Sequence, residues 1–309
     1  MNQEKCKTRE WLDSQAMACR LCPRACGVRR TERRGYCGMG AEPVLARAAL
    51  HVWEEPVLCG EKGSGALFFS GCTLGCVYCQ NRSISRERFG RAVTEERLAD
   101  IMLRLQDEGA ANIDLITADM FLPAVLRALD AVRGRLTIPV VYNCSGYQRP
   151  ELIDALDGYV DVYLPDLKYY DSDLSARYSA APDYFAVASR ALVRMCEQTG
   201  PPVFDEAGLL VRGTLVRHLV LPGCRKDSMA LMEWMARALP KGGFLLSLLS
   251  QYTPAFADAA FPELGRPVTG FEYESVVKKA LELGLDQGFR QEQESAKSDY
   301  RPDFDLTGL

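Results

Sequence analysis

The chain has 309 residues, enough for one barrel-sized domain with a short appendage and a large buried core. Its formal net charge is −4 and its isoelectric point is near 5.5, so the charge balance gives no indication of a nucleic-acid surface. No apolar run approaches a membrane span, and the charged N-terminus lacks the apolar core of a signal peptide or anchor. These features predict a cytoplasmic globular protein that binds neither nucleic acid nor membrane.

Twelve cysteines are present, and they cluster toward the first quarter of the chain. This distribution favours metal ligation in a reducing compartment over a disulfide framework. Four of them lie in the Pro- and Gly-containing segment CRLCPRACGVRRTERRGYCGMG, which is too short for its own hydrophobic core: Cys19, Cys22, Cys26 and Cys37. Four thiolates in such a segment predict a module stapled by a metal. Zinc and a second iron-sulfur cluster both fit, and reduced free cysteines are the alternative.

Several arginines crowd the same segment, and we expect them to form a solvated face, with contact to a partner protein as the alternative: Arg24, Arg29, Arg30, Arg33 and Arg34. Residues 41–65 are expected to be a linker that leads into the first strand. The GEKGSG stretch within it is not a P-loop, because it lacks the Gly-Lys-Ser/Thr ending. We therefore divide the chain into a Cys-rich extension with its linker, residues 1–60, and a main domain with a C-terminal cover segment, residues 61–309.

The main domain is organised around the stretch ALFFSGCTLGCVYCQN. Residues 66–70 predict a buried strand, because a short apolar run with two aromatics that stops at a glycine suits a sheet interior. Directly after it, Cys72, Cys76 and Cys79 have the spacing CxxxCxxC, which lets one tight loop offer three thiolates to three irons of a [4Fe-4S] cube. The fourth iron then has no cysteine, and an open iron suits catalysis rather than electron storage.

This motif, with the aromatic Tyr78 just before its last cysteine, resembles the cluster motif of radical S-adenosylmethionine (SAM) enzymes. The wider stretch GSGALFFSGCTLGCVYCQNRSIS resembles the branch related to pyruvate formate-lyase activating enzyme, and the resemblance extends from Cys19 to about Phe304. It implies that SAM chelates the open iron and that one electron cleaves SAM into methionine and a 5'-deoxyadenosyl radical. It also implies reduced flavodoxin or ferredoxin as electron donor. The N-terminal CPRxC and GxC are similar to relatives known only as iron-sulfur proteins, which leaves the metal there open.

Strand and helix patterns alternate along the main domain. Six strands are predicted, at residues 66–70, 112–117, 138–142, 161–165, within 209–221, and 244–249. The first predicted helix begins near Thr94, and four more cover residues 120–132, 150–156, 184–197 and 272–283. Residues 287–305 are expected to cover an edge of the sheet or the barrel mouth. Such alternation predicts a parallel sheet with right-handed crossovers, closed or nearly so. This α/β pattern agrees with the partial (β/α)6 barrel that the resemblance implies, here with an N-terminal Cys-rich metal-binding extension.

Polar residues follow the predicted strands, where barrels of this kind place their chemistry. Thr117 and Asp119 stand where many superfamily members have Gly-Gly-Glu to hold the SAM amino group, and they are candidates to accept hydrogen bonds from that ammonium. Capping of a helix N-terminus is the alternative role for Asp119. Asn143 and Ser145 fall where related activating enzymes have an Asp-Thr-Asn-Gly turn, with Asn143 replacing the acid.

Asp166 and Lys168 lie in an Asp-Leu-Lys sequence that those relatives share, and in them the aspartate helps to hold a monovalent cation beside the SAM carboxylate. In the fifth strand, alternation allows only one of Arg217 and His218 to face the barrel interior. Because relatives carry arginine here, we expect Arg217 to bind the SAM carboxylate or a substrate carbonyl. His218 is expected to be a bystander. Residues 250–252 are candidates to close over the adenine or the substrate.

Together these features predict a radical SAM enzyme whose radical abstracts hydrogen from an unidentified substrate. A glycyl-radical activase, which acts on a protein, is the nearest analogy. Modification of a small molecule or of another protein is a second enzymatic interpretation. A non-catalytic iron-sulfur carrier or electron-transfer protein is the alternative of another class, but it needs neither an open iron nor a barrel.

Overall fold

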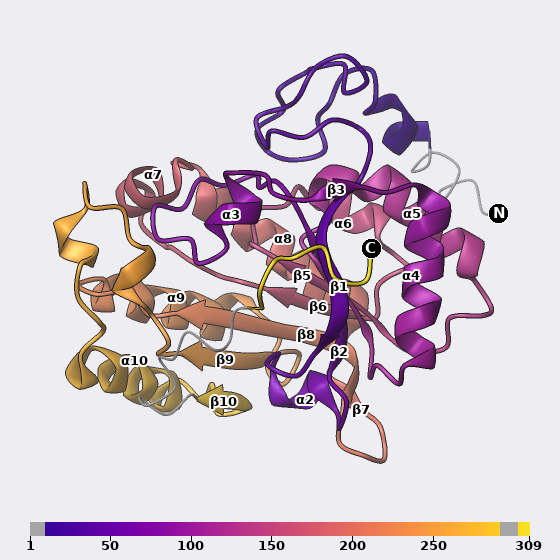
Figure 1. The fold of residues 1–309 in the computed structure, drawn as a ribbon. Helices are drawn as coiled ribbons and strands as arrows, with labels where there is room; N and C mark the ends of the chain where they lie inside the picture. Colours follow the sequence, from indigo (N-terminus) through magenta and orange to yellow (C-terminus); the bar gives the residue numbers. More distant parts are fainter. Residues whose placement is uncertain (1–9, 291–301) are drawn as a thin grey trace.

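A computed structural model of the chain describes residues 10–290 and 302–309. Its centre is a ten-stranded sheet in which seven neighbouring strands run parallel (Figure 1). The parallel strands are β2 (Ser64–Phe69), β4 (Ile113–Ile116), β5 (Val140–Cys144), β6 (Val162–Pro165), β8 (Leu210–Leu219), β9 (Leu245–Leu249) and β10 (Gly288–Arg290). The first six confirm the six predicted strands. The seventh, β10, pairs with β9 and extends the edge that residues 287–305 were expected to cover.

Helices connect the parallel strands, as the predicted alternation requires. They are α4 (Glu95–Asp107), α5 (Leu122–Val132), α6 (Pro150–Ala155), α7 (Ser172–Ser179), α8 (Tyr184–Thr199), α9 (Arg225–Ala238) and α10 (Gly270–Glu282), with short helices α2 (Pro56–Cys59) and α3 (Arg82–Ser85) and 3-10 turns η1 (Asp119–Phe121), η2 (Pro254–Phe256) and η3 (Pro262–Leu264). Thr94 caps α4 as predicted, because its side chain accepts a hydrogen bond from the Arg97 backbone N–H. The helices α7 and α9 were not among those predicted from the sequence. Within the described residues, no helix is long and apolar enough to cross a membrane.

The predicted linker is partly wrong. Its residues 44–51 form β1 (Val44–His51), which pairs antiparallel with β2. The short strands β3 (Arg91–Ala92) and β7 (Val203–Phe204) pair antiparallel with β1 and β8. The alanines of β1 are poor strand formers, and its pairing with a buried neighbour outweighs that local preference. The sheet therefore begins before residue 61.

Side-chain alternation along the parallel strands creates two separate apolar layers. Tyr142 and Tyr163 join the large core under the helices, whereas Val141, Leu164 and Leu215 join a small cluster with Leu58 of α2. Because strand side chains alternate, the residues two positions further along point to the same side as the members of the small cluster. On β5, on β8 and just after β6, those residues are polar: Asn143, Arg217 and Asp166.

Candidate cluster and cofactor site

The loop after β2 carries the three cysteines of the motif to the carboxyl ends of the parallel strands. A cavity of about 310 Å³ lies there, and all eleven barrel residues chosen from the sequence line it: Cys72, Cys76, Tyr78, Cys79, Thr117, Asp119, Asn143, Ser145, Asp166, Lys168 and Arg217. They come from five separate segments of the chain. The fold thus brings the predicted set together in one place, in the position where α/β barrels hold their active groups. Gln251 and Tyr252, from the segment expected to close over the site, line the same cavity.

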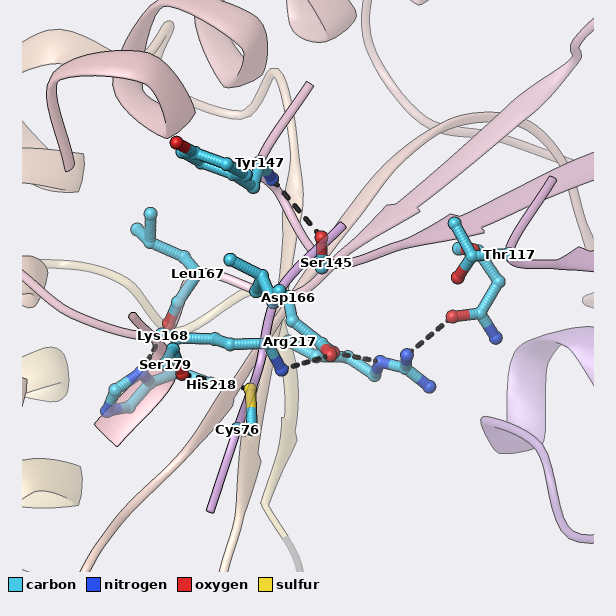
Figure 2. Close-up of polar contacts among 12 residues, drawn as sticks. Cys76, Thr117, Ser145, Tyr147, Asp166, Leu167, Lys168, Ser179, Arg217 and His218 are labelled. Atoms are coloured by element: carbon cyan, nitrogen blue, oxygen red, sulfur yellow. Dashed lines mark hydrogen bonds and ion pairs between the residues drawn. The ribbon is translucent and has the colours of Figure 1, made fainter. Parts of the chain in front are cut away.

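A network of charges crosses one wall of the cavity. Arg217 Nε lies 2.9 Å from Asp166 Oδ1, and Lys168 Nζ lies 2.7 Å from Asp166 Oδ2. Figure 2 shows these three side chains turned toward one another beside Cys76. Burial opposes ionisation of Asp166, but the charges of Arg217 and Lys168 outweigh it and lower the pKa of the carboxyl. Asp166 is therefore an anion held between two cations.

Arg217 has further partners deeper in the barrel. Its Nη1 lies 2.9 Å from Glu54 Oε1, and its Nη2 donates to Asn143 Oδ1 at 2.6 Å. Asn143 Nδ2 in turn donates to Glu54 Oε2 at 3.0 Å and to Asp114 Oδ2 at 3.3 Å. Burial raises the pKa of Asp114 well above its usual range, and among the described residues its Oδ1 has no hydrogen-bond partner.

Glu54 was not predicted as a site residue, because it lies inside the expected linker of residues 41–65. The signal that pointed to it is the pair Glu54-Glu55 just before Pro56, since adjacent acids at a strand end need cationic partners when they are buried. Glu55 is buried and accepts a hydrogen bond from Ser247 at 3.0 Å, and burial raises its pKa to about 7.

Thr117 and Asp119 follow β4 and are held by neighbouring strands. Thr117 Oγ1 donates to the Asn143 carbonyl at 2.8 Å. Asp119 accepts hydrogen bonds from Tyr142 Oη at 2.5 Å and Gln148 Nε2 at 2.8 Å, and burial raises its pKa to about 6. Its alternative role as a helix cap is wrong, because its side chain bonds to Tyr142 and Gln148 and the caps of η1 and α5 are Ala118 and Phe121.

A second polar chain reaches one of the motif cysteines from outside the predicted set. Ser179 Oγ lies 2.9 Å from Cys76 Sγ (Figure 2). It also lies 2.7 Å from Tyr169 Oη, which lies 2.6 Å from Tyr78 Oη. Ser179 ends α7, a helix without predicted bounds, and no local signal marks Ser179 or Tyr169 as neighbours of the motif. Tyr78 therefore packs against the cluster loop and also joins a hydrogen-bond chain.

Arg217 and His218 point in opposite directions, as alternation requires. His218 is buried, with Nδ1 2.6 Å from the Leu167 carbonyl oxygen and Nε2 2.9 Å from Ser228 Oγ of α9. Burial lowers the pKa of His218 to about 4, so the imidazole is neutral at pH 7. His218 connects β8 to its helix, and only Arg217 faces the cavity.

Comparison with known proteins agrees with this geometry. Residues 67–210, from β2 to the start of β8, match the model of the radical SAM superfamily. Residues 67–210 form a radical SAM domain. A further relative is the uncharacterized protein MJ0674 of Methanocaldococcus jannaschii, 27% identical over 280 residues that cover 87% of this chain and 75% of the relative.

Solved structures of other radical SAM proteins are similar at lower identity. A domain of pyruvate-formate lyase-activating enzyme from Bacteroides vulgatus is 14% identical, with 64% of this chain and 91% of that chain covered and a TM-score of 0.36. SuiB from Streptococcus suis, in its complex with S-adenosylmethionine, is 12% identical, with 75% of this chain and 51% of that chain covered and a TM-score of 0.48.

The residues around the cavity fit the group that radical SAM proteins hold. The motif loop offers three thiols, one fewer than the four irons of a cube, and the cavity beside them has the size of a small-molecule site. Its lining contains cations for a carboxylate, Lys168 and Arg217, and oxygen acceptors for an ammonium, Thr117 and Asp119. Cys144, which ends β5, is a further cysteine in the lining, but it lies outside the motif loop.

The four N-terminal cysteines lie in loops that pack beside the barrel mouth. Cys19 and Cys37 are buried, Cys22 is half-buried and Cys26 is exposed. No group of three His, Cys, Asp or Glu side chains in residues 10–290 and 302–309 is arranged to hold a metal ion. The expected solvated face of arginines is wrong for Arg30, which is 5% exposed.

Proposed function

We propose that Cys72, Cys76 and Cys79 ligate a [4Fe-4S] cluster with one open iron, and that SAM binds there and is cleaved reductively. The observation that carries the proposal is the convergence of the three motif thiols and eight other predicted residues on a single cavity. When bound, the cluster supplies the electron that splits SAM into methionine and a 5'-deoxyadenosyl radical, which takes hydrogen from the substrate.

The side chains of this chain match the charges of SAM. Lys168 and Arg217 donate to its carboxylate, and Asp166 holds both cations in position through its two oxygens. Relatives use the aspartate for a monovalent cation beside that carboxylate. In this chain the Lys168 ammonium donates a hydrogen bond to Asp166 Oδ2. We therefore assign to Lys168 the positive charge beside the SAM carboxylate. Thr117 and Asp119 accept from the SAM ammonium.

For the substrate we propose a protein, as for a glycyl-radical activating enzyme. The support is the similarity of the motif stretch and of Asp166-Leu167-Lys168 to that branch of the superfamily. Reduced flavodoxin or ferredoxin is the proposed electron donor. A small molecule is the second candidate substrate, and transfer of deuterium from labelled candidates into 5'-deoxyadenosine distinguishes the two.

The test is release of 5'-deoxyadenosine from SAM by the anaerobically reconstituted protein, with and without reductant. We expect reductant-dependent release that Cys76→Ala abolishes, because loss of one thiolate removes a ligand of the cluster. The matched control is Cys196→Ala, which changes a buried cysteine of α8 and should retain release. Normal release by Cys76→Ala would contradict the assignment, and absence of release from the wild type would favour a non-catalytic carrier.

A further inference from the structure

The N-terminal cysteines surround a buried positive charge. The Arg30 side chain donates from Nη1 to Cys19 Sγ at 3.5 Å and from Nε to the Gly40 carbonyl at 3.2 Å. Within the described residues, no carboxylate forms an ion pair with Arg30. A guanidinium cannot lose its proton, so burying it without an anion is costly.

Metal-bound thiolates remove this cost. Four protonated thiols carry no charge, whereas four thiolates on a zinc ion or a [4Fe-4S] cube carry a net negative charge beside Arg30. Cys26 and Cys37 approach each other around Gly35, where an added Cβ would lie 3.2 Å from Cys26 Sγ and 3.6 Å from Cys37 Sγ. The buried arginine therefore supports a closed, anionic four-cysteine centre.

The N-terminal segment that holds Cys19 to Cys37 also contacts the loop that holds Cys72 to Cys79. A Cβ placed on Gly71, the residue before Cys72, would lie 2.9 Å from the Cys37 carbonyl oxygen and 2.5 Å from Met39 Cγ. Gly71 has φ 90°, and the absence of a side chain lets the two backbones meet. The backbone of Cys37, a cysteine of the N-terminal segment, thus contacts Gly71, the residue before the motif cysteine Cys72.

Arg24 fastens the module to the other side of the loop. Its Nε donates to the Thr73 carbonyl at 2.9 Å, and its Nη1 donates to the Ala180 carbonyl, just after α7, at 2.6 Å. The guanidinium also lies over the rings of Tyr36 and Tyr147, at 4.2 and 5.3 Å from their centroids. Arg24 is therefore a clamp between the two cysteine loops, where the sequence predicts a solvated side chain.

We propose that Cys19, Cys22, Cys26 and Cys37 hold a second [4Fe-4S] cluster, which relays single electrons from a reduced low-potential carrier protein to the cluster on Cys72, Cys76 and Cys79. The transfer moves one electron and forms or breaks no bond. We choose a cluster over zinc because zinc has no redox chemistry, whereas the module is built against the loop that needs electrons. A cube also attaches each thiolate to a separate iron, so its ligands spread wider than those of a single ion. The destination of the electrons rests on the function proposed above.

Metal analysis of the full-length protein tests the identity of the centre. We expect about eight irons in the wild type, and about four in both Cys19→Ala/Cys22→Ala and Cys72→Ala/Cys76→Ala, with no zinc in any of them. A wild type with about four irons and about one zinc would overturn the second cluster. Loss of iron only from the N-terminal variant would instead overturn the barrel assignment, so the two failures are distinguishable.

The relay is tested by electron paramagnetic resonance of the freeze-quenched barrel cluster during reduction. With reduced flavodoxin as the reductant, Cys19→Ala/Cys22→Ala should lose the fast phase of reduction, whereas dithionite, a small reductant, should reduce its barrel cluster as in the wild type. An unchanged fast phase with flavodoxin would overturn the relay, because it would show that electrons pass directly from flavodoxin to the barrel cluster. The candidate site for that direct transfer is the hollow lined by Cys76, Cys79, Arg82, Arg86 and Arg88.

Arg24→Gln is the second variant, because it keeps all four cysteines while removing the clamp. We expect eight irons and a slower fast phase, since the module is no longer held against the Thr73 carbonyl. Arg29→Gln is the matched control, because Arg29 pairs only with the exposed Glu32 among the described side chains. A normal fast phase in Arg24→Gln would contradict the role of the contact.

Discussion

At the residue scale, the cavity wall depends on how the Arg217 guanidinium is held. Three oxygen-bearing side chains surround it: Glu54, Asn143 and Asp166. Removing one partner of a buried ion pair costs more than the pair itself contributes, because the remaining charge is left without compensation. The position of Arg217 is therefore set jointly by Asn143 on β5, Asp166 just after β6 and Glu54 after β1.

Glu54→Gln tests the deepest of these contacts. The side chain of Glu54 is 9% exposed, so we expect the variant to lose about 3 kcal/mol of unfolding free energy in urea titrations of the metal-free protein. Glu61→Gln, which changes an exposed acid two residues after α2, should change it by less than about 0.5 kcal/mol. Equal stability of Glu54→Gln and the wild type would show that Arg217 is held without Glu54.

Asp166→Asn separates cofactor binding from folding. Glu54 and Asn143 still hold Arg217 in this variant, so the cluster content and the unfolding temperature should stay close to those of the wild type. SAM affinity, measured by equilibrium dialysis, should fall by about tenfold or more, equivalent to about 1.4 kcal/mol, because Lys168 and Arg217 lose their common anchor. Unchanged affinity would rule out the role of Asp166, and so would a variant that unfolds.

At the element scale, six of the parallel strands were predictable and the antiparallel strand β1 was not. The buried runs at β2, β4, β5, β6, β8 and β9 carry their own pattern, and alternation within β8 correctly separates Arg217 from His218. The strand β1 was not predictable, because its alanines and Arg47 give no strand signal. It is defined by pairing with β2, β3 and the C-terminal segment. Ala48 N–H, for example, donates to the Thr307 carbonyl at 2.9 Å.

His218 makes the contact between β8 and α9 sensitive to pH. Its pKa in the folded protein is about 4, below the usual value near 6.5, so the unfolded chain binds more protons between these values. The stabilisation is complete above about pH 6.5 and is lost as the pH falls toward 4. Between pH 7 and pH 5, we expect the wild type to lose about 2 kcal/mol more unfolding free energy than His218→Gln. Parallel pH dependences of the two proteins would contradict this.

At the scale of the whole molecule, the N-terminal loops and the last residues both pack onto the barrel. The C-terminal segment runs beside β1, where Asp305 pairs with Arg47 at 2.9 Å. The sequence predicted which residues lie at the barrel mouth, because strand ends are local features. It could not predict the contacts of Arg24 with Ser179, of Glu54 with Arg217 and of Ser179 with Cys76. These pairs are 155, 163 and 103 residues apart in the sequence, and only the folded chain brings them together.

The central claim is that SAM chelates an open iron of the cluster held by Cys72, Cys76 and Cys79. Electron-nuclear double resonance on the reduced wild-type protein with SAM labelled by nitrogen-15 in its amino group tests it directly. We expect a nitrogen hyperfine coupling to the cluster, and we expect Cys76→Ala to lack it. Absence of this coupling in wild-type protein that retains SAM in equilibrium dialysis would contradict it.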